Sequence, residues 1–242
     1  MAEFIFMLTH HDATVADALN VYDALRETAL EHVGFKDIGA TTQALAELTR
    51  RMHADGRTVY LEVVSVSAED EVRSIRAARE IGVDVVMGGT HVQAGLPLLA
   101  GSGIRYYPFP GRIVGHPSVL EGTIEEIAAS AAALTALDGV DGLDLLAYRH
   151  SDPVDPIIAA VVKASRGPVV VAGSIDSAEQ IEAVTRLGAW GFTIGGAVFE
   201  NALPAEHNLR AQVSWALETA ARAADQQDSP GCQSPWGSKT QI

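Results

Sequence analysis

Short apolar runs alternate with helical patterns along most of the chain. Each run is rich in Val, Ile, Leu or aromatic residues, and each is followed by a segment with apolar residues three or four positions apart. The predicted strands are residues 4–8, 32–38, 58–64, 83–87, 104–109, 142–148, 169–172 and 192–194. Strict alternation of strand and helix predicts an α/β protein with a parallel sheet, and eight such units favour a single closed (β/α)8 or TIM barrel.

An open doubly wound sheet is the structural alternative to the closed barrel. Such a sheet usually carries a glycine-rich phosphate turn after its first strand. Here the first predicted strand is followed by THHD at residues 9–12, without glycine. The closed barrel is therefore the better prediction.

Several residue pairs predict where helices begin and which connection is long. Thr123 and Glu126 have capping-box spacing, so a helix is expected to begin after Thr123. Asp152 before Pro153 predicts an N-cap followed by proline at the first helical position. Residues 110–122 lack clear periodicity, and such a long connection is often a lid or binding loop.

Composition limits the classes of partner. The chain has 242 residues, 48% of them hydrophobic, and a formal net charge of −14. This negative net charge repels nucleic acid phosphates and anionic membranes, so neither is expected as a partner. Formation of a homo-oligomer is compatible with the sequence. No apolar stretch reaches the roughly 20 residues that cross a bilayer, and a single cysteine excludes an intrachain disulfide. We expect a cytoplasmic protein with a barrel over residues 1–225 and a disordered C-terminal tail over residues 226–242.

Polar residues follow most of the predicted strands. In a TIM barrel the carboxyl ends of the strands form the active face, so these side chains are expected to converge there. The candidates for substrate binding are Asp12, Asp37, Thr90, Tyr148 and Arg149, with Arg112 and His116 in the long connection as lid candidates.

Residues 168–200 contain two strand ends with small residues. One predicted strand ends at Gly173 and Ser174, and the next at Gly195 and Gly196. Small residues at a strand end let backbone N–H groups approach a ligand closely, and loops after strands seven and eight of a barrel commonly hold phosphate. We interpret these four residues as a phosphate-binding site, with tight turn geometry alone as the competing explanation.

The segment VVVAGSIDSAEQIEAVTRLGAWGFTIGGAVFE, residues 169–200, resembles the ribulose-phosphate-binding barrel superfamily. That superfamily includes histidine-biosynthesis isomerases, indole-glycerol-phosphate synthase and N-acetylmannosamine-6-phosphate epimerases. The resemblance implies phosphate binding by the backbone at the two glycine-containing strand ends. Lys36 looks like a lysine that the sugar-phosphate epimerases carry after strand two. Their acid after strand seven is absent, because Ala172 and Gly173 stand there. A second resemblance is to glycerol-responsive antiterminator proteins.

Lys36 and Glu62 are the preferred acid–base pair. A carboxylate within TVYLEVV at residues 58–64 would be costly to bury unpaired. Glu62 is therefore expected either to face the barrel interior and pair there, for example with Lys36 from the neighbouring strand, or to face the helices. A pair with Lys36 would be a structural ion pair or would tune Glu62 as a base. His10 and His91 are candidates to polarise a carbonyl. Adjacent residues of a strand point to opposite sides, so His10 and His11 are not expected to share a metal.

These features predict an enzyme that acts on a small phosphorylated sugar, polyol or acid. The expected chemistry is proton transfer beside a carbonyl, as in an isomerase or epimerase, or retro-aldol cleavage, as in a lyase. The alternative is a non-catalytic regulator of the antiterminator type that senses a phosphorylated metabolite. No cofactor is predicted, although a divalent metal such as Mg²⁺ is compatible with either function.

Overall fold

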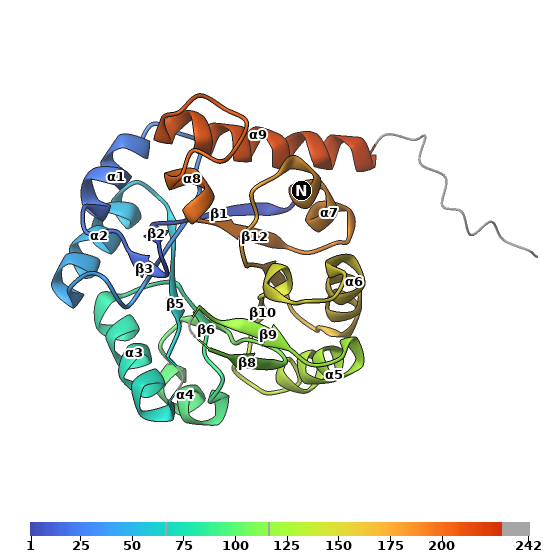
Figure 1. The fold of residues 1–242 in the computed structure, drawn as a ribbon. Helices are drawn as coiled ribbons and strands as arrows, with labels where there is room; N and C mark the ends of the chain where they lie inside the picture. Colours follow the sequence, from blue (N-terminus) through green and yellow to red (C-terminus); the bar gives the residue numbers. More distant parts are fainter. Residues whose placement is uncertain (66, 116, 229–242) are drawn as a thin grey trace, which may run out of the picture.

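Parallel strands form a barrel that is surrounded by helices (Figure 1). The computed structural model describes residues 1–65, 67–115 and 117–228. The sheet holds eight strands in the order β10-β11-β12-β1-β4-β5-β6-β7. These strands are β1 (Glu3–Met7), β4 (His32–Lys36), β5 (Thr58–Val63), β6 (Val85–Gly88), β7 (Arg105–Tyr107), β10 (Leu143–Leu145), β11 (Val169–Val171) and β12 (Gly191–Ile194). Each falls on one of the predicted strands, so the TIM-barrel prediction is confirmed.

Helices alternate with the barrel strands and cover the outside of the sheet. They are α1 (Ala18–Leu25), α2 (Thr42–Ala54), α3 (Ala68–Ile81), α4 (Val92–Leu99), α5 (Ile124–Leu134), α6 (Val154–Ala164), α7 (Ala178–Arg186), the short α8 (Gly196–Phe199) and α9 (Leu209–Asp228). The tail predicted to be disordered lies, from residue 229 on, outside the described residues. No helix among the described residues is both long and apolar enough to span a membrane.

The barrel closes between β7 and β10 through single backbone hydrogen bonds. The N–H of Asp144 donates to the carbonyl of Pro108 at 3.1 Å, and the N–H of Asp141 donates to that of Tyr106 at 2.9 Å. β7 and β10 are consecutive barrel strands, and the pairing of β12 with β1 joins the end of the barrel to its beginning. Polar residues at the carboxyl ends of all the strands share one mouth.

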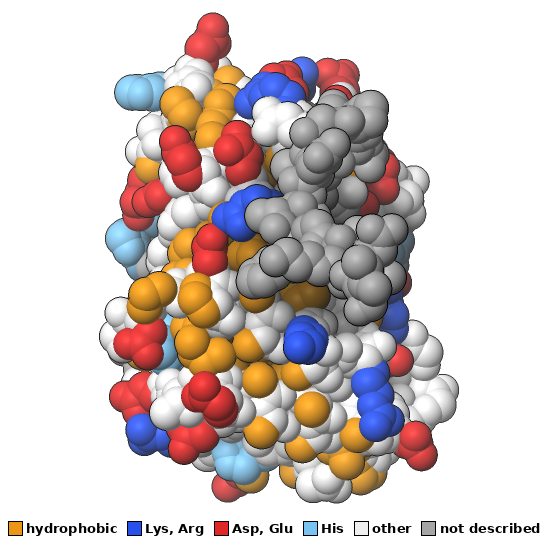
Figure 2. Space-filling model, turned by 90° about the vertical axis from the view of Figure 1, so that its right-hand side faces the viewer, with side chains coloured by type: hydrophobic (Ala, Val, Ile, Leu, Met, Phe, Trp, Pro, Cys, Tyr) orange, Lys and Arg blue, Asp and Glu red, His pale blue; other side chains and the backbone are white. Residues whose placement is uncertain are grey.

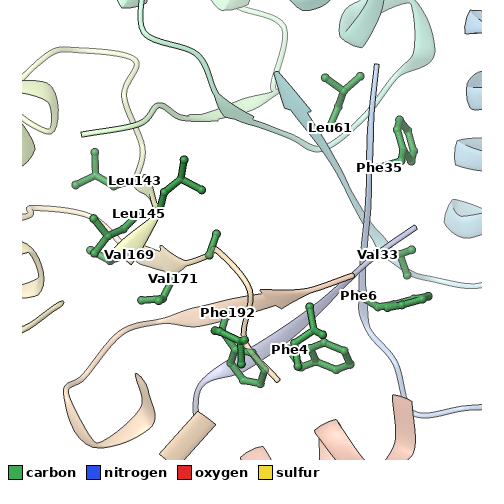
Figure 3. Packing of buried hydrophobic residues seen from close by; sticks show 14 of the residues in the cluster. Phe4, Phe6, Val33, Phe35, Leu61, Leu143, Leu145, Val169, Val171 and Phe192 are labelled. Atoms are coloured by element: carbon green, nitrogen blue, oxygen red, sulfur yellow. The ribbon is translucent and has the colours of Figure 1, made fainter. Parts of the chain in front are cut away.

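Alternation along each strand separates two hydrophobic layers. Phe4, Phe6 and Val33 point outward and pack against the helices (Figure 3). Ile5 and Met7, the alternate residues of β1, belong to a smaller cluster inside the barrel with Tyr60, Val85, Met87, Tyr107 and Val170. The same alternation directs Lys36 of β4 inward, because its neighbour Phe35 packs outward.

The connection at residues 110–122 is an antiparallel hairpin, not the irregular loop predicted from its lack of periodicity. Strands β8 (Arg112–Val114) and β9 (Val119–Glu121) pair in the register Ile113↔Leu120. The strands have three residues each, too few for a period of two to show in the sequence. His116, a predicted lid residue, lies outside the described residues.

The predicted helix starts are confirmed in one case and wrong in another. Thr123 and Glu126 form the expected capping box of α5. The prediction for α6 is wrong, because Pro153 itself is the N-cap and its backbone is extended (φ −53°, ψ 126°). A proline there has no N–H to leave unsatisfied, so the helix begins at Val154 without an aspartate cap. Pro97 lies inside α4, which continues to Leu99.

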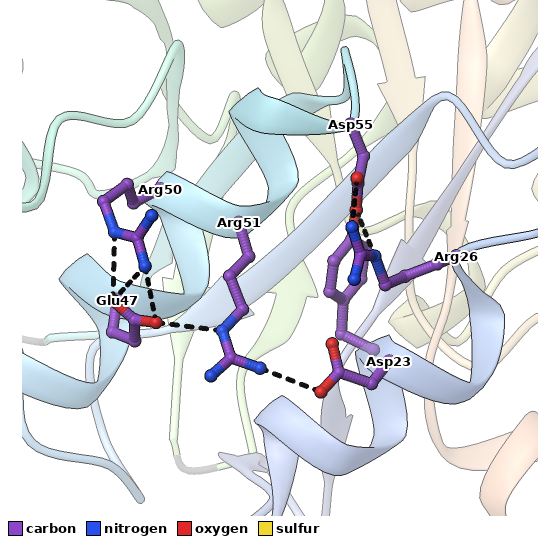
Figure 4. A network of polar contacts seen from close by, with 7 residues as sticks. Asp23, Arg26, Glu47, Arg50, Arg51 and Asp55 are labelled. Carbon is purple, nitrogen blue, oxygen red and sulfur yellow. Dashed lines mark hydrogen bonds and ion pairs between the residues drawn. The ribbon is translucent and has the colours of Figure 1, made fainter.

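Ion pairs join α1 to α2 on the outer surface of the barrel (Figure 4). Arg51 contacts Asp23 at 2.8 Å and Glu47 at 2.9 Å, while Arg26 contacts Asp55 at 2.7 Å. Because most of these side chains are partly exposed, each pair adds little stability. The network therefore fixes how the two helices sit more than how stable the barrel is.

On the face shown in Figure 2, the acidic side chains are spread out. Figure 2 shows one side of the barrel, where acidic side chains are scattered among hydrophobic ones and the basic side chains stand apart from one another. The net charge of −14 is thus not gathered in one patch on this face.

Candidate active site at the mouth of the barrel

A cavity of about 490 Å³ lies at the carboxyl ends of the strands. Nine of the residues predicted from the sequence line it: His10, Asp12, Lys36, Glu62, Arg149, Gly173, Ser174, Gly195 and Gly196. They come from both ends of the sequence, and closure of the barrel brings them together. The cavity is large enough for a small metabolite.

A two-residue hairpin after β1 places the first of these side chains. Strands β2 (Thr9–His10) and β3 (Ala13–Thr14) are antiparallel, and His11 and Asp12 form the turn between them. Both turn residues have positive φ, 49° and 60°, as in type I′ hairpin turns. Such conformations are uncommon for residues other than glycine and gather at functional sites, where they re-aim side chains.

Lys36 is the buried cation of the site. It is 4% exposed, and its Nζ lies 2.7 Å from Oδ1 of Asp12 and 3.7 Å from Oε2 of Glu62. Lys36 and Glu62 are register partners on β4 and β5. The predicted pairing of these two residues is therefore confirmed.

Asp12 is held as a carboxylate by the surrounding cations. Burial by itself raises the pKa of Asp12, but the hydrogen bond from Lys36 and the charges of Lys36 and Arg149 outweigh burial and lower the pKa below its usual value. Arg149 donates from Nη2 to Oδ1 of Asp12 at 3.2 Å and from Nη1 to the carbonyl of Ser118 at 3.2 Å. It lies in the 3₁₀ turn η1 (Ala147–Arg149) that follows β10.

Asp144 is the main polar residue that the sequence analysis missed. It lies on β10 between the outward-facing Leu143 and Leu145, so its side chain points into the barrel. It is fully buried, and neither carboxyl oxygen has a hydrogen-bond partner among the described residues. Burial raises its pKa well above the usual value, and the charge of Glu62 adds to this. Burial therefore favours the protonated form of Asp144. The sequence signal for an inward-facing Asp144 was an acid between two leucines in GLDLLAY. Glu62 shows the same kind of signal in TVYLEVV.

The two glycine-containing strand ends face the same cavity. Gly173 and Ser174 have positive φ values of 102° and 69°. Among the hydrogen bonds of the described residues, none occupies the backbone N–H groups of Gly173, Ser174 or Gly196. A side chain at Gly173 would clash with Arg149, because an added Cβ would lie 2.8 Å from its Cγ. These N–H groups are available to an anion, which is what the phosphate prediction requires.

Five predicted residues do not line the cavity in the described part of the chain: Asp37, Thr90, His91, Arg112 and Tyr148. Asp37 accepts a hydrogen bond from Ser74. Arg112 pairs with Glu121 across the β8–β9 hairpin, and Tyr148 donates to the carbonyl of Gln180 at 3.4 Å.

Thr90 and His91 are held away from the cavity by a buried glutamate. The backbone N–H groups of both donate to Glu71 of α3 at 2.9 Å, and the hydroxyl of Tyr106 donates to it at 3.2 Å. Glu71 is fully buried, and its only signal in the sequence is its place in the first turn of a helix. His91 is the N-cap residue of α4.

Solved structures share the architecture of the chain. Neither a protein-family model nor a curated protein matches it. The native KDPGal structure covers 92% of this chain and 94% of its own, with 13% identity and a TM-score of 0.61. A mutant tryptophan synthase alpha-subunit from Pyrococcus furiosus covers 91% and 98%, with 12% identity and a TM-score of 0.64. L-Ribulose 3-epimerase covers 96% and 100%, with 16% identity and a TM-score of 0.58. The chain has the TIM-barrel fold. At these identities the likeness establishes the fold alone.

Proposed function

We propose that the chain is an enzyme that moves a proton next to a carbonyl group in a small phosphorylated sugar, polyol or acid. The observation that carries the proposal is the buried Lys36 ammonium between Asp12 and Glu62, in a cavity whose lining also includes two glycine-containing strand ends. Epimerase and synthase barrels among the similar structures add support from the fold only.

Lys36 and Glu62 are the reacting groups of this proposal. An ammonium has three N–H donors, and one of them donates to Asp12. Glu62 lies 3.7 Å away as an ion pair, so donors remain for a carbonyl oxygen of the substrate. Glu62 would take the proton from the adjacent carbon, and the ammonium would stabilise the enolate that forms. Return of the proton to the same carbon from the other face, or to its neighbour, would give an epimer or an isomer.

Asp144 and Arg149 support this pair. Burial and the charge of Glu62 raise the pKa of Asp144, which favours its neutral form and so limits the negative charge beside Glu62. Arg149 holds Asp12 in place, and Asp12 in turn orients Lys36. Retro-aldol cleavage would use the same ammonium to stabilise an enolate, with a carboxylate taking the proton of the hydroxyl group.

The phosphate would be held by the backbone of Gly173, Ser174, Gly195 and Gly196. Its role is positional, because fixing one end of a small substrate places the reacting carbon against Glu62. Phosphorylated compounds should therefore bind much more tightly than their unphosphorylated counterparts.

Proton transfer is best tested by exchange with solvent deuterium. The protein is incubated in D₂O with a panel of ketose, aldose and polyol phosphates, and NMR follows deuterium entering the carbon next to the carbonyl. Lys36→Met and Glu62→Gln should each lower the exchange rate at least about 100-fold. Lys163→Met and Glu182→Gln are matched controls, because both residues are exposed on outer helices.

Different outcomes separate the alternatives. Appearance of two smaller carbonyl products would show a lyase. Wild-type rates in the Lys36 and Glu62 variants would refute the assigned roles. Tight binding of a phosphorylated compound with neither exchange nor cleavage would favour the non-catalytic regulator.

A further inference from the structure

Two histidines and a glutamate gather at one edge of the cavity. His10, His11 and Glu200 each offer a donor atom, and the three atoms lie within 4.8 Å of one another. His10 Nε2 is 3.1 Å from Oε1 of Glu200, and the two imidazole rings are 3.7 Å apart between centroids. All three residues line the cavity that contains Lys36.

The hairpin turn explains why adjacent histidines lie on the same side. The expectation that His10 and His11 point apart is wrong, because strand β2 ends at His10 and His11 has a left-handed backbone. Alternation applies only to extended residues. The turn thus folds the second imidazole back onto the first.

Gly195 brings the glutamate to the histidines. A Cβ at this residue would lie 2.7 Å from Oγ1 and 2.8 Å from the carbonyl oxygen of Thr9, so only glycine allows the end of β12 to pack against β2. The short helix α8 then begins, and Glu200 is its C-cap residue. Close contact of two backbones therefore sets the position of all three donors.

The charges around the cluster leave the glutamate without a basic partner. Two other carboxylates that line the cavity pair with a Lys or Arg side chain: Asp12 with Lys36 and Arg149, and Glu62 with Lys36. Among the described ion pairs, Glu200 contacts only His10. An additional positive charge at this edge would be favourable.

Two imidazole nitrogens and one carboxylate oxygen are a donor set of the kind that zinc and similar transition metals prefer. In a tetrahedral site with bonds of about 2.0–2.1 Å, donor atoms lie about 3.3 Å apart. The distance between His10 and Glu200 already meets this requirement. The side chain of Glu200 is 56% exposed and that of His10 30%, so both can turn to complete the site.

We propose that His10, His11 and Glu200 form a binding site for a divalent transition metal of the zinc type. Three protein ligands leave at least one coordination position open, as in catalytic zinc sites. That position would face the cavity and accept water or a substrate oxygen. The site goes beyond the proposed reaction, because metal binding requires neither turnover nor a phosphorylated compound.

The test is calorimetric titration of the full chain with Zn²⁺ and, separately, with Mg²⁺, after removal of metals by a chelator. A Cys232→Ser background removes the only thiol of the chain. We expect one Zn²⁺ per chain and much weaker Mg²⁺ binding. His10→Gln, His11→Asn and Glu200→Gln should each weaken Zn²⁺ binding at least about tenfold. Asn is chosen for the turn because it tolerates positive φ.

The matched control is His53→Gln. His53 forms a similar exposed pair with Asp84, with Nε2 and Oδ2 2.9 Å apart, but no third donor is grouped with it among the described residues. Unchanged affinity in this variant is expected. Absence of saturable Zn²⁺ binding, equal loss in the control, or Mg²⁺ binding as tight as Zn²⁺ would overturn the proposal.

A second measurement uses only the wild-type chain, so it tests the proposal even if a variant does not fold. NMR signals of the imidazole protons in the wild-type chain should shift for two histidines when Zn²⁺ is added. The signals should stay unshifted with Mg²⁺. A chain in which no histidine signal responds to Zn²⁺ has no such site.

Discussion

Replacement of the buried Asp144 by asparagine should stabilise the protein increasingly as the pH rises. Burial, reinforced by the charge of Glu62, raises the pKa of Asp144 well above its usual 3.8. The folded chain therefore keeps a proton that the unfolded chain releases. The stability that this proton contributes is complete below the unfolded pKa and is lost as the pH rises toward the folded pKa. The amide of the Asp144→Asn variant does not titrate, so that variant would escape this loss.

The magnitude follows from the number of protons involved. One proton that is kept on folding changes the free energy of unfolding by about 1.4 kcal/mol per pH unit. At pH values between the unfolded and the folded pKa, the wild type should therefore lose up to about 1.4 kcal/mol per pH unit relative to Asp144→Asn. Lys36 and Arg149 lower the pKa of Asp144 in part, so the difference levels off where the folded group finally ionises.

Urea unfolding at a series of pH values measures this difference. Circular dichroism and tryptophan fluorescence should give the same midpoints if unfolding is two-state. Asp138→Asn is the matched control, because Asp138 lies outside the barrel, in the connection between α5 and β10. A difference between wild type and Asp144→Asn that stays constant as the pH rises above the unfolded pKa would refute the raised pKa of Asp144.

Two further predictions concern a close backbone contact and a surface ion pair. Gly195→Ala should lower the free energy of unfolding by about 1–3 kcal/mol, because its Cβ would meet the backbone of Thr9 at 2.8 Å. Gly196→Ala is the control, since its Cβ would find nothing closer than 3.8 Å, and thermal melts of the two variants should differ accordingly. The hydrogen bond from Arg26 lowers the pKa of Asp55 to about 2. The stability from this pair is present above the unfolded pKa of 3.8 and is lost as the pH falls toward 2, so Asp55→Asn should flatten the acid side of a pH-dependent melting curve. An unchanged acid limb in that variant would show that the pair contributes nothing.

Much of the fold could be predicted from the sequence because its signals are local. Each barrel strand appears as a short apolar run, and α3 begins after the cap residue Ser67 and ends at Gly82. The pairing of Lys36 with Glu62 could also be predicted, because a charged residue within an apolar strand requires a partner nearby. The hairpin at residues 110–122 could not, because its strands are too short to show a period.

The site could be predicted only in part, because its geometry depends on contacts between distant segments. Nine of the candidate residues line one cavity, yet His91 and Thr90 are bound to Glu71 instead. Which way a side chain at the end of a strand turns is decided by its neighbours in the fold, and these are remote in the sequence. Asp144 follows a pattern that was visible in the sequence.

Local patterns along the chain set the number of strand–helix units, the alternation of sides along each strand and the glycine-containing ends of the last two strands. These properties depend on periods of two and 3.6 residues and on single-residue preferences. Which inward-facing residues come into contact depends on how the barrel closes. Closure of the barrel places Asp144 near Glu62. The left-handed turn at His11 and Asp12 directs the ring of His11 toward His10 and the carboxylate of Asp12 toward Lys36. The contact of Gly195 with Thr9 brings Glu200 to the histidines. Each of these contacts joins residues that are far apart along the chain or depends on one unusual backbone angle. Neither kind of contact produces a periodic pattern in the sequence.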